Sequence, residues 1–320
     1  MNTSRTRGET GRPAGSHRPD RDRRADLLHP AELAALGGLE FVARHVVEGF
    51  IAGLHRSPHR GFSVEFAEHR MYQAGDDLRY IDWRMFGRSD RYYIKQFEEE
   101  TNLRGYLLVD TSASMGWSSV PGSLPPKLWY ARQLAACLAL MLIRQGDAVG
   151  LIAFDDAIRA RTAPRGGRRH WHDVVRTLES VDAAGRTDPG SALQDLATRL
   201  RRRGLVILIS DLLVDPEATR LALRYLRHRG HEVLVFHLMD PGERELPGVG
   251  DVRFYDPETG DEVPVSAADM RREYGAAVEH AIAEWQRELV PHGIDHVLVS
   301  TAEPLAQALR AYLRKRERLG

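Results

Sequence analysis

Three oxygen-bearing side chains stand at alternate positions directly after an apolar run. Asp110, Ser112 and Ser114 follow Tyr106-Leu107-Leu108-Val109, a run typical of a buried strand. Alternation along an extended turn points the three side chains the same way. One carboxylate and two hydroxyls suit a hard cation such as Mg²⁺, which takes octahedral oxygen coordination. The loop therefore predicts part of a cation site whose other oxygens come from elsewhere in the chain.

Two later segments offer the missing oxygens. Thr187 lies in a polar loop at residues 185–190, and Asp211 follows the apolar run at residues 205–209. In an open parallel sheet, ligands bind beyond the carboxyl ends of the strands, so these segments are expected to meet the first loop there. The candidate metal ligands are Asp110, Ser112, Ser114, Thr187 and Asp211.

The same residues also have structural interpretations. Asp, Ser and Thr after a strand form Asx turns or cap a following helix, which is the alternative for residues 110–112. Thr187 and Asp188 are likewise placed to cap a helix that begins near Pro189. Spacing alone leaves both interpretations open.

Apolar periodicity predicts strands alternating with helices from residue 104 onward. Such alternation predicts a Rossmann-like α/β fold, with a mainly parallel central sheet and helices on both faces. Residues 251–265 predict an added hairpin. The expected strands are 105–109, 148–154, 205–210, 232–238 and 295–299, and the expected helices are 126–144, 168–180, 190–202, 216–229, 267–289 and 304–317.

The N-terminal part of the chain differs in composition. Residues 1–28 are rich in arginine and poor in apolar residues, so they predict a disordered tail. Residues 29–103 predict a short flank of β or irregular structure, in which residues 30–56 fit a helix and a strand alike and short extended stretches are expected at 63–66 and 92–97. The α/β domain then occupies residues 104–320. A polar segment of the flank, at residues 75–83, is either a surface that binds a partner or a structural turn. Its charged residues are Asp76, Asp77, Arg79 and Asp82.

Composition narrows the functional classes. The 320 residues are 42% hydrophobic, which allows a large core, and 45 basic residues balance 45 acidic ones. Neutral net charge argues against nucleic-acid or membrane attraction. A single cysteine, Cys137, excludes an intrachain disulfide and a cysteine zinc cluster, and it fits the reducing cytoplasm. The apolar run around it is too short to span a bilayer. His170 and His172 lack a third ligand for zinc.

Two motifs resemble those of known families. The Asp-x-Ser-x-Ser loop, the later threonine and the strand-end aspartate resemble the metal-ion-dependent adhesion site of von Willebrand factor A domains. Upstream, YQAGDDLRYIDW at residues 72–83 and YIKQFEEE at residues 93–100 resemble the signature of the bacterial family catalogued as domain of unknown function 58. The resemblance implies a von Willebrand factor A-like fold with the five candidate ligands in its metal site.

The resemblance also implies a function. A site rich in hydroxyls leaves the ion positively charged, with one position open to an incoming Asp or Glu. The expectation is a protein that is not an enzyme but a Mg²⁺-dependent interaction module, with Mn²⁺ or Ca²⁺ as other ions. It implies an adaptor or co-chaperone that works with a MoxR-type AAA+ ATPase and binds an unknown client.

Two other functions remain as alternatives. One is a metal-dependent phosphoester hydrolase that uses Asp110 and Asp211 as metal ligands and Asp188 or Asp215 as an extra acid. The other is a purely structural domain that binds no metal. Metal titration and phosphoesterase assays separate the three.

Overall fold

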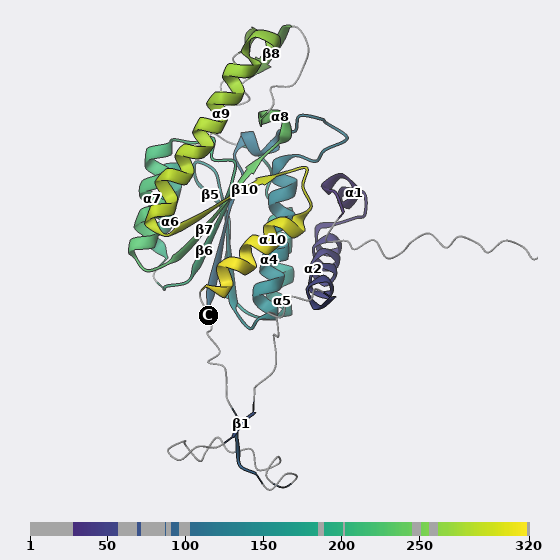
Figure 1. Cartoon of the computed structure of the whole chain (residues 1–320), viewed down its shortest axis with the longest axis vertical. Helices are drawn as coiled ribbons and strands as arrows, with labels where there is room; N and C mark the ends of the chain where they lie inside the picture. The colour runs from purple at the N-terminus through teal and green to yellow at the C-terminus, as the bar shows by residue number, and fades with distance from the viewer. Residues whose placement is uncertain are drawn as a thin grey trace, which may run out of the picture.

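The computed structural model describes most of the chain from Leu28 onward. The described residues are 28–56, 69–71, 87, 91–95, 103–184, 189–200, 202–244, 251–255 and 262–318. Figure 1 shows a central sheet with helices packed on both of its faces. This is the doubly covered α/β arrangement that the sequence predicts.

Six strands form the central sheet, in the order β10-β7-β6-β3-β4-β5. Neighbouring strands are parallel except β4 and β5, which are antiparallel. Every residue of β6 is buried, because helices cover the sheet on both sides. The strands are β3 (Arg104–Asp110), β4 (Ala148–Phe154), β5 (Ile158–Arg165), β6 (Leu205–Ser210), β7 (Glu232–Met239) and β10 (Ile294–Ser300).

The helices divide between the two faces, and each face has its own hydrophobic core. One core joins the sheet to α4, α5 and α10, and the other joins it to α6, α7 and α9. Within the described residues, no helix is both long and apolar enough to cross a bilayer. These helices are α4 (Lys127–Arg144), α5 (Arg168–Glu179), α6 (Pro189–Arg199), α7 (Pro216–His228), α9 (Ala267–Leu289) and α10 (Leu305–Glu317).

Residues 30–56, which fit helix and strand alike, are helical. They form α1 (Pro30–Ala34) and α2 (Leu39–Arg56), and α2 packs against α4. Val46 and Phe50 of α2 are buried in the same core as α4. Figure 1 shows α2 on the outer side of α4, as a further layer. The expected β or irregular flank thus begins with a helix that belongs to the core.

The expected strands do not include β5. Its residues alternate between partly buried and exposed, and among the described strands it pairs with β4 alone, at the edge of the sheet. A half-exposed edge strand with the sequence IRARTAPR has too few apolar residues to predict a strand. Its position nonetheless fits the preference of proline and arginine for sheet edges.

The smaller elements lie outside the central sheet. The hairpin expected at residues 251–265 is present as the antiparallel pair β8 (Asp251–Tyr255) and β9 (Glu262–Ser266). The stretch expected at 92–97 contains β2 (Tyr93–Lys95), which pairs with β1 (His69–Met71), whereas 63–66 lies outside the described residues. The short helical elements are η3 (Ala113–Gly116), α8 (Pro241–Arg244) and η4 (Val290–His292).

Candidate metal centre

The carboxyl ends of two neighbouring strands bring the predicted aspartates to one edge of the sheet. β3 ends at Asp110, and its parallel neighbour β6 ends at Ser210, directly before Asp211. Ser112 precedes η3 and Ser114 lies in it. Asp110 and Ser112 are 0% exposed, Asp211 is 2% exposed and Ser114 is 9% exposed. Four predicted ligands therefore lie together in a buried position.

Asp110 is held only by neutral groups. Its Oδ1 accepts the backbone N–H of Ser112 at 2.9 Å, and its Oδ2 accepts the hydroxyl of Ser210 at 2.6 Å. The hydroxyl oxygens of Ser112 and Ser114 share a hydrogen bond at 3.0 Å. Among the described residues, Asp110 makes no ion pair. A buried carboxylate without a counter-charge is energetically costly.

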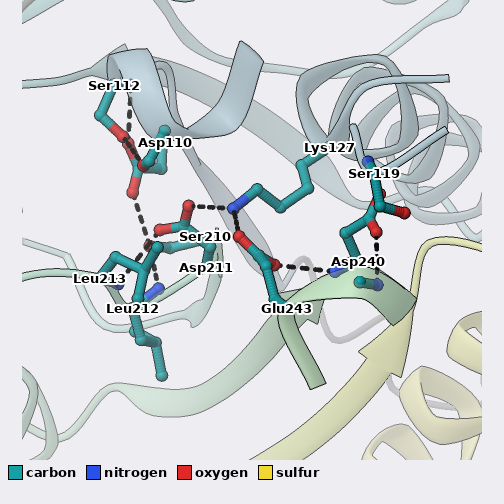
Figure 2. Close-up of polar contacts among 12 residues, drawn as sticks. Asp110, Ser112, Ser119, Lys127, Ser210, Asp211, Leu212, Leu213, Asp240 and Glu243 are labelled. Atoms are coloured by element: carbon teal, nitrogen blue, oxygen red, sulfur yellow. Dashed lines mark hydrogen bonds and ion pairs between the residues drawn. The ribbon is translucent and has the colours of Figure 1, made fainter. Parts of the chain in front are cut away.

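Asp211, in contrast, is paired with a cation from α4. The Nζ of Lys127 donates to Asp211 Oδ2 at 2.8 Å and also to Glu243 Oε1, as Figure 2 shows. The side chain of Lys127 is 0% exposed. The Oδ1 of Asp211 accepts the backbone N–H of Leu213 at 3.1 Å. Both oxygens of this carboxylate thus have partners within the chain.

Glu243 connects this ion cluster to α8 and α9. Its Oε2 accepts the backbone N–H of Asp240 at 2.9 Å, and its carbonyl accepts the hydroxyl of Tyr274, in α9, at 2.7 Å. The buried carboxylate of Asp240 accepts backbone N–H groups from Gly242 at 2.8 Å and from Ser119 at 3.1 Å. The strand edge is therefore linked through Lys127 and Glu243 to elements far along the chain.

Burial and charge act differently on the two aspartates. Burial raises the pKa of Asp110 to about 6, the charge of Asp211 adds to the rise, and hydrogen bonds from Ser210 and Ser112 oppose it. Burial also favours a higher pKa for Asp211, but Lys127, with hydrogen bonds from Ser114 and Leu213, holds that pKa below its usual range. The ammonium thus compensates one carboxylate and leaves the other without a cation.

A divalent cation fits this arrangement by charge and by donor type. Asp110 lacks a counter-charge, and its two oxygens keep lone pairs beyond the hydrogen bonds that they accept. Ser112 and Ser114 add neutral oxygens of the kind that Mg²⁺ and Ca²⁺ accept. Across the described residues, no three His, Cys, Asp or Glu side chains gather as a metal group, so the hydroxyls are essential to such a site. Lys127 opposes it, because its ammonium binds Asp211.

Sequence reasoning did not find Lys127 and Glu243. Lys127 begins a helix that is otherwise mostly apolar, and no acidic residue lies in its first turn. A cation is unfavourable at the positive end of a helix dipole, so a lysine there signals a specific carboxylate partner. Glu243 carries no comparable signal, since it lies in a helix of only four residues.

Other predicted residues have different outcomes. Thr187 and Asp188 lie outside the described residues, as do Asp76, Asp77, Arg79 and Asp82. Asp215, the extra acid of the hydrolase alternative, caps α7 by accepting the backbone N–H of Glu217 at 2.9 Å. His170 hydrogen-bonds the carbonyl of Val149 at 2.6 Å, and His172 pairs with Glu40 at 3.0 Å. These two histidines make structural contacts near the start of α5.

Comparison with known proteins identifies the family. The sequence matches the family described as "Protein of unknown function DUF58" over residues 68–284. The chain belongs to this family. An uncharacterized protein of Mycobacterium tuberculosis is 33% identical to it over 255 residues, which cover 79% of this chain and 78% of the relative.

The DUF58 protein is also similar to solved structures of low sequence identity. An aerotolerance-related membrane protein from Bacteroides fragilis is 18% identical, with a TM-score of 0.46 and coverage of 68% of this chain and 99% of that one. A von Willebrand factor type A structure from Catenulispora acidiphila is 16% identical, with a TM-score of 0.31 and coverage of 54% and 42%. The six-stranded, mainly parallel sheet covered by helices on both faces (Figure 1) agrees with the Rossmann-like, von Willebrand factor A-like fold expected from the sequence.

Proposed function

We propose that this DUF58 protein binds a divalent cation, Mg²⁺ in the first place and Mn²⁺ or Ca²⁺ as other ions, at the carboxyl edge of β3 and β6. Asp110, Ser112, Ser114 and Asp211 would hold the ion, with Thr187 as a further ligand. The observation that carries the proposal is Asp110, a fully buried carboxylate whose described partners are all neutral. A cation at this edge relieves the repulsion between Asp110 and Asp211.

The cation site serves binding and not catalysis. Two of its four described ligands are neutral hydroxyls, which are weaker donors than carboxylates, so a bound dication retains affinity for one further carboxylate, supplied by a partner. Exposed apolar side chains lie in the loops around the site: Trp117 is 37% exposed, Val120 51% and Leu213 58%. Apolar groups beside a charged anchor are typical of protein interfaces. We infer a Mg²⁺-dependent protein-interaction module that takes an Asp or Glu of its partner.

The partners follow from the resemblance to the family. We propose an adaptor or co-chaperone in the cytoplasm that links a MoxR-type AAA+ ATPase to a client protein. Membership of the DUF58 family supports this assignment. Co-purification of the ATPase with the wild type but not with Ser112→Ala, in Mg²⁺, tests it.

Metal titration tests the cation site directly. Calorimetry and thermal unfolding with Mg²⁺ and Mn²⁺ compare the wild type with Asp110→Ala. A ligand at about 100 times its Kd stabilises the folded state by about 2.7 kcal/mol, so the wild type should gain stability and the variant should not. A wild type that binds neither ion, with its partner present or absent, would refute the site.

The same samples test the hydrolase alternative. Asp215 caps α7 with its carboxylate, so it is not free to act as the extra acid, and Asp188, the other candidate acid, lies outside the described residues. We expect no Mg²⁺- or Mn²⁺-dependent hydrolysis of a phosphomonoester such as p-nitrophenyl phosphate. Metal-dependent turnover that disappears in Asp110→Ala would instead favour the hydrolase.

A further inference from the structure

Lys127 is a buried ammonium with two acidic partners from different elements. It binds Asp211, at the strand edge, and Glu243, in α8. The side chain of Lys127 is 0% exposed, that of Asp211 is 1% exposed and that of Glu243 is 19% exposed. Water therefore contributes little to screening these charges, and their mutual interactions are strong.

Lys127 and a divalent cation need the same carboxylate. Asp211 Oδ2 accepts a hydrogen bond from the Nζ of Lys127, and Oδ1 accepts one from the backbone N–H of Leu213. The negative charge of Asp211 is thus already neutralised by a group of the chain. Two positive ions close to one buried carboxylate repel each other. An incoming dication therefore competes with the ammonium for Asp211.

Glu243 is a second ion-pair partner for Lys127. Its Oε1 already binds the ammonium in this structure, and it is fixed by the backbone N–H of Asp240 at its other oxygen. Lys127 can thus release Asp211 without losing every acidic partner. A buried lysine whose sole partner was Asp211 would have no such alternative.

We propose that Lys127 is the internal counter-ion of the cation site. While no metal is bound, its ammonium neutralises Asp211; when a divalent cation binds Asp211, the ammonium leaves Asp211 and keeps Glu243 as its acidic partner. This inference rests on the proposed cation site and concerns how that site is regulated. Because the carbonyl of Glu243 accepts the hydroxyl of Tyr274, the exchange links the cation site to α8 and α9. Lys127 is a positioning residue and does not bind the metal.

Substitutions of Lys127 and of Glu243 should change metal affinity in opposite directions. In calorimetric titration with Mg²⁺, Lys127→Met should bind about tenfold more tightly than the wild type or better, because the competing charge is gone; tenfold corresponds to about 1.4 kcal/mol. Glu243→Gln should bind more weakly, because Lys127 loses its second negatively charged partner and keeps only a neutral acceptor there. In the double variant, the effect of Glu243→Gln should disappear, since no lysine remains to be displaced.

Lys315 offers a matched control. It is a second buried lysine with two carboxylate partners, Glu232 at 2.7 Å and Asp295 at 2.8 Å, at the start of β7 and β10 and hence at the opposite edge of the sheet. Lys315→Met should lower the melting temperature and leave Mg²⁺ affinity unchanged. A readout without metal completes the test: in EDTA, Lys127→Met should melt below the wild type, and adding Asp211→Asn should recover part of the loss.

The outcomes separate this inference from the cation site itself. Equal or weaker Mg²⁺ binding by folded Lys127→Met refutes the counter-ion role and leaves the site in place. If Lys127→Met does not fold, tighter or unchanged binding by Glu243→Gln refutes it instead. Absence of Mg²⁺ binding in the wild type and in every variant refutes the cation site, and the counter-ion role with it.

Discussion

Asp110 differs from Asp211 and Glu243, its acidic neighbours at this edge, in having no cation beside it among the described residues. Asp211 and Glu243 share Lys127, and Asp240 accepts two backbone N–H groups. Asp110 depends on one hydroxyl and one amide, and its pKa rises to about 6. The metal-free protein therefore carries a destabilising charge at Asp110.

We expect Asp110→Asn to stabilise the metal-free protein by about 1–3 kcal/mol at neutral pH, because asparagine keeps the size of the side chain without its charge. The folded pKa of about 6 lies above the ordinary value of 3.8. The folded wild type therefore takes up this proton before the unfolded chain does, and it gains stability from Asp110 as the pH falls through about 6 towards about 4. The advantage of the variant should shrink over the same interval. Urea unfolding in EDTA at several pH values measures it.

Excess Mg²⁺ provides the control for this prediction. The wild type should then gain stability and the variant should not, so the difference in free energy of unfolding between the two proteins is expected to narrow or reverse. Equal stability of both proteins in EDTA at neutral pH would mean that the charge of Asp110 is already compensated.

The acidic ligands were predictable from sequence, but their ion partner was not. Asp110 and Asp211 each follow an apolar run, a local pattern that places them at strand ends. Lys127 lies 84 positions from Asp211 and 116 from Glu243 along the chain. Such a pair depends on how helices pack on the sheet, which no local spacing encodes.

At the scale of elements, the register of the sheet depends on close approaches between backbones. Gly204 directly precedes β6, and a Cβ at this position would lie 2.2 Å from the carbonyl oxygen of Arg104, at the start of β3. The carbonyl of Gly204 also accepts the backbone N–H of Glu232 at 3.0 Å. A side chain here would push apart the two strands that carry Asp110 and Asp211.

We expect Gly204→Ala to lower the free energy of unfolding by about 1–3 kcal/mol or more, because backbone atoms must shift to admit the methyl group. Gly275 in α9 is the matched control, since a Cβ there meets no atom within 4 Å. Gly275→Ala should stabilise the protein by about 0.5–1 kcal/mol, as alanine does within a helix. Chemical denaturation of the two variants measures both effects. A Gly204→Ala variant with the same free energy of unfolding as the wild type would show that β3 and β6 can separate at little cost.

At the scale of the whole molecule, the helical start of the N-terminal flank shares the core of the α/β domain. Phe50 is 2% exposed and packs in the same cluster as Leu134 and Trp171, while Phe41, in the same helix, is 47% exposed. α2 therefore covers α4 with one face and leaves the other face to solvent. A boundary near residue 104 would separate parts that share one hydrophobic core.

Phe50→Ala should destabilise the whole protein by about 3–5 kcal/mol, because it leaves a cavity in the core. Phe41→Ala should change stability by less than about 1 kcal/mol, as is usual for exposed positions. Unfolding followed by circular dichroism and by tryptophan fluorescence should give coincident transitions for both variants. Separate transitions, with the α/β domain unaffected by Phe50→Ala, would instead favour an independent flank.

The sequence by itself determined the α/β class, most of the strands and helices, and the two acidic positions at strand ends. These features depend on local apolar periodicity and on the rule that ligands bind at the carboxyl ends of parallel strands. The expected and observed bounds of α9 agree, and those of β6 agree likewise.

Only the tertiary structure decided the edge strand β5, the packing of α2 on α4 and the ion cluster of Lys127. β5 has few apolar residues and forms by pairing with β4. The sequence of α2 fits a helix and a strand equally well, and its packing on α4 selects the helix. Lys127 is neutralised by Asp211 and Glu243, which are distant in sequence. For α2 and Lys127 the deciding energy comes from contacts between segments distant in sequence, and for β5 it comes from pairing with the neighbouring strand β4; a pattern of apolar residues contains neither.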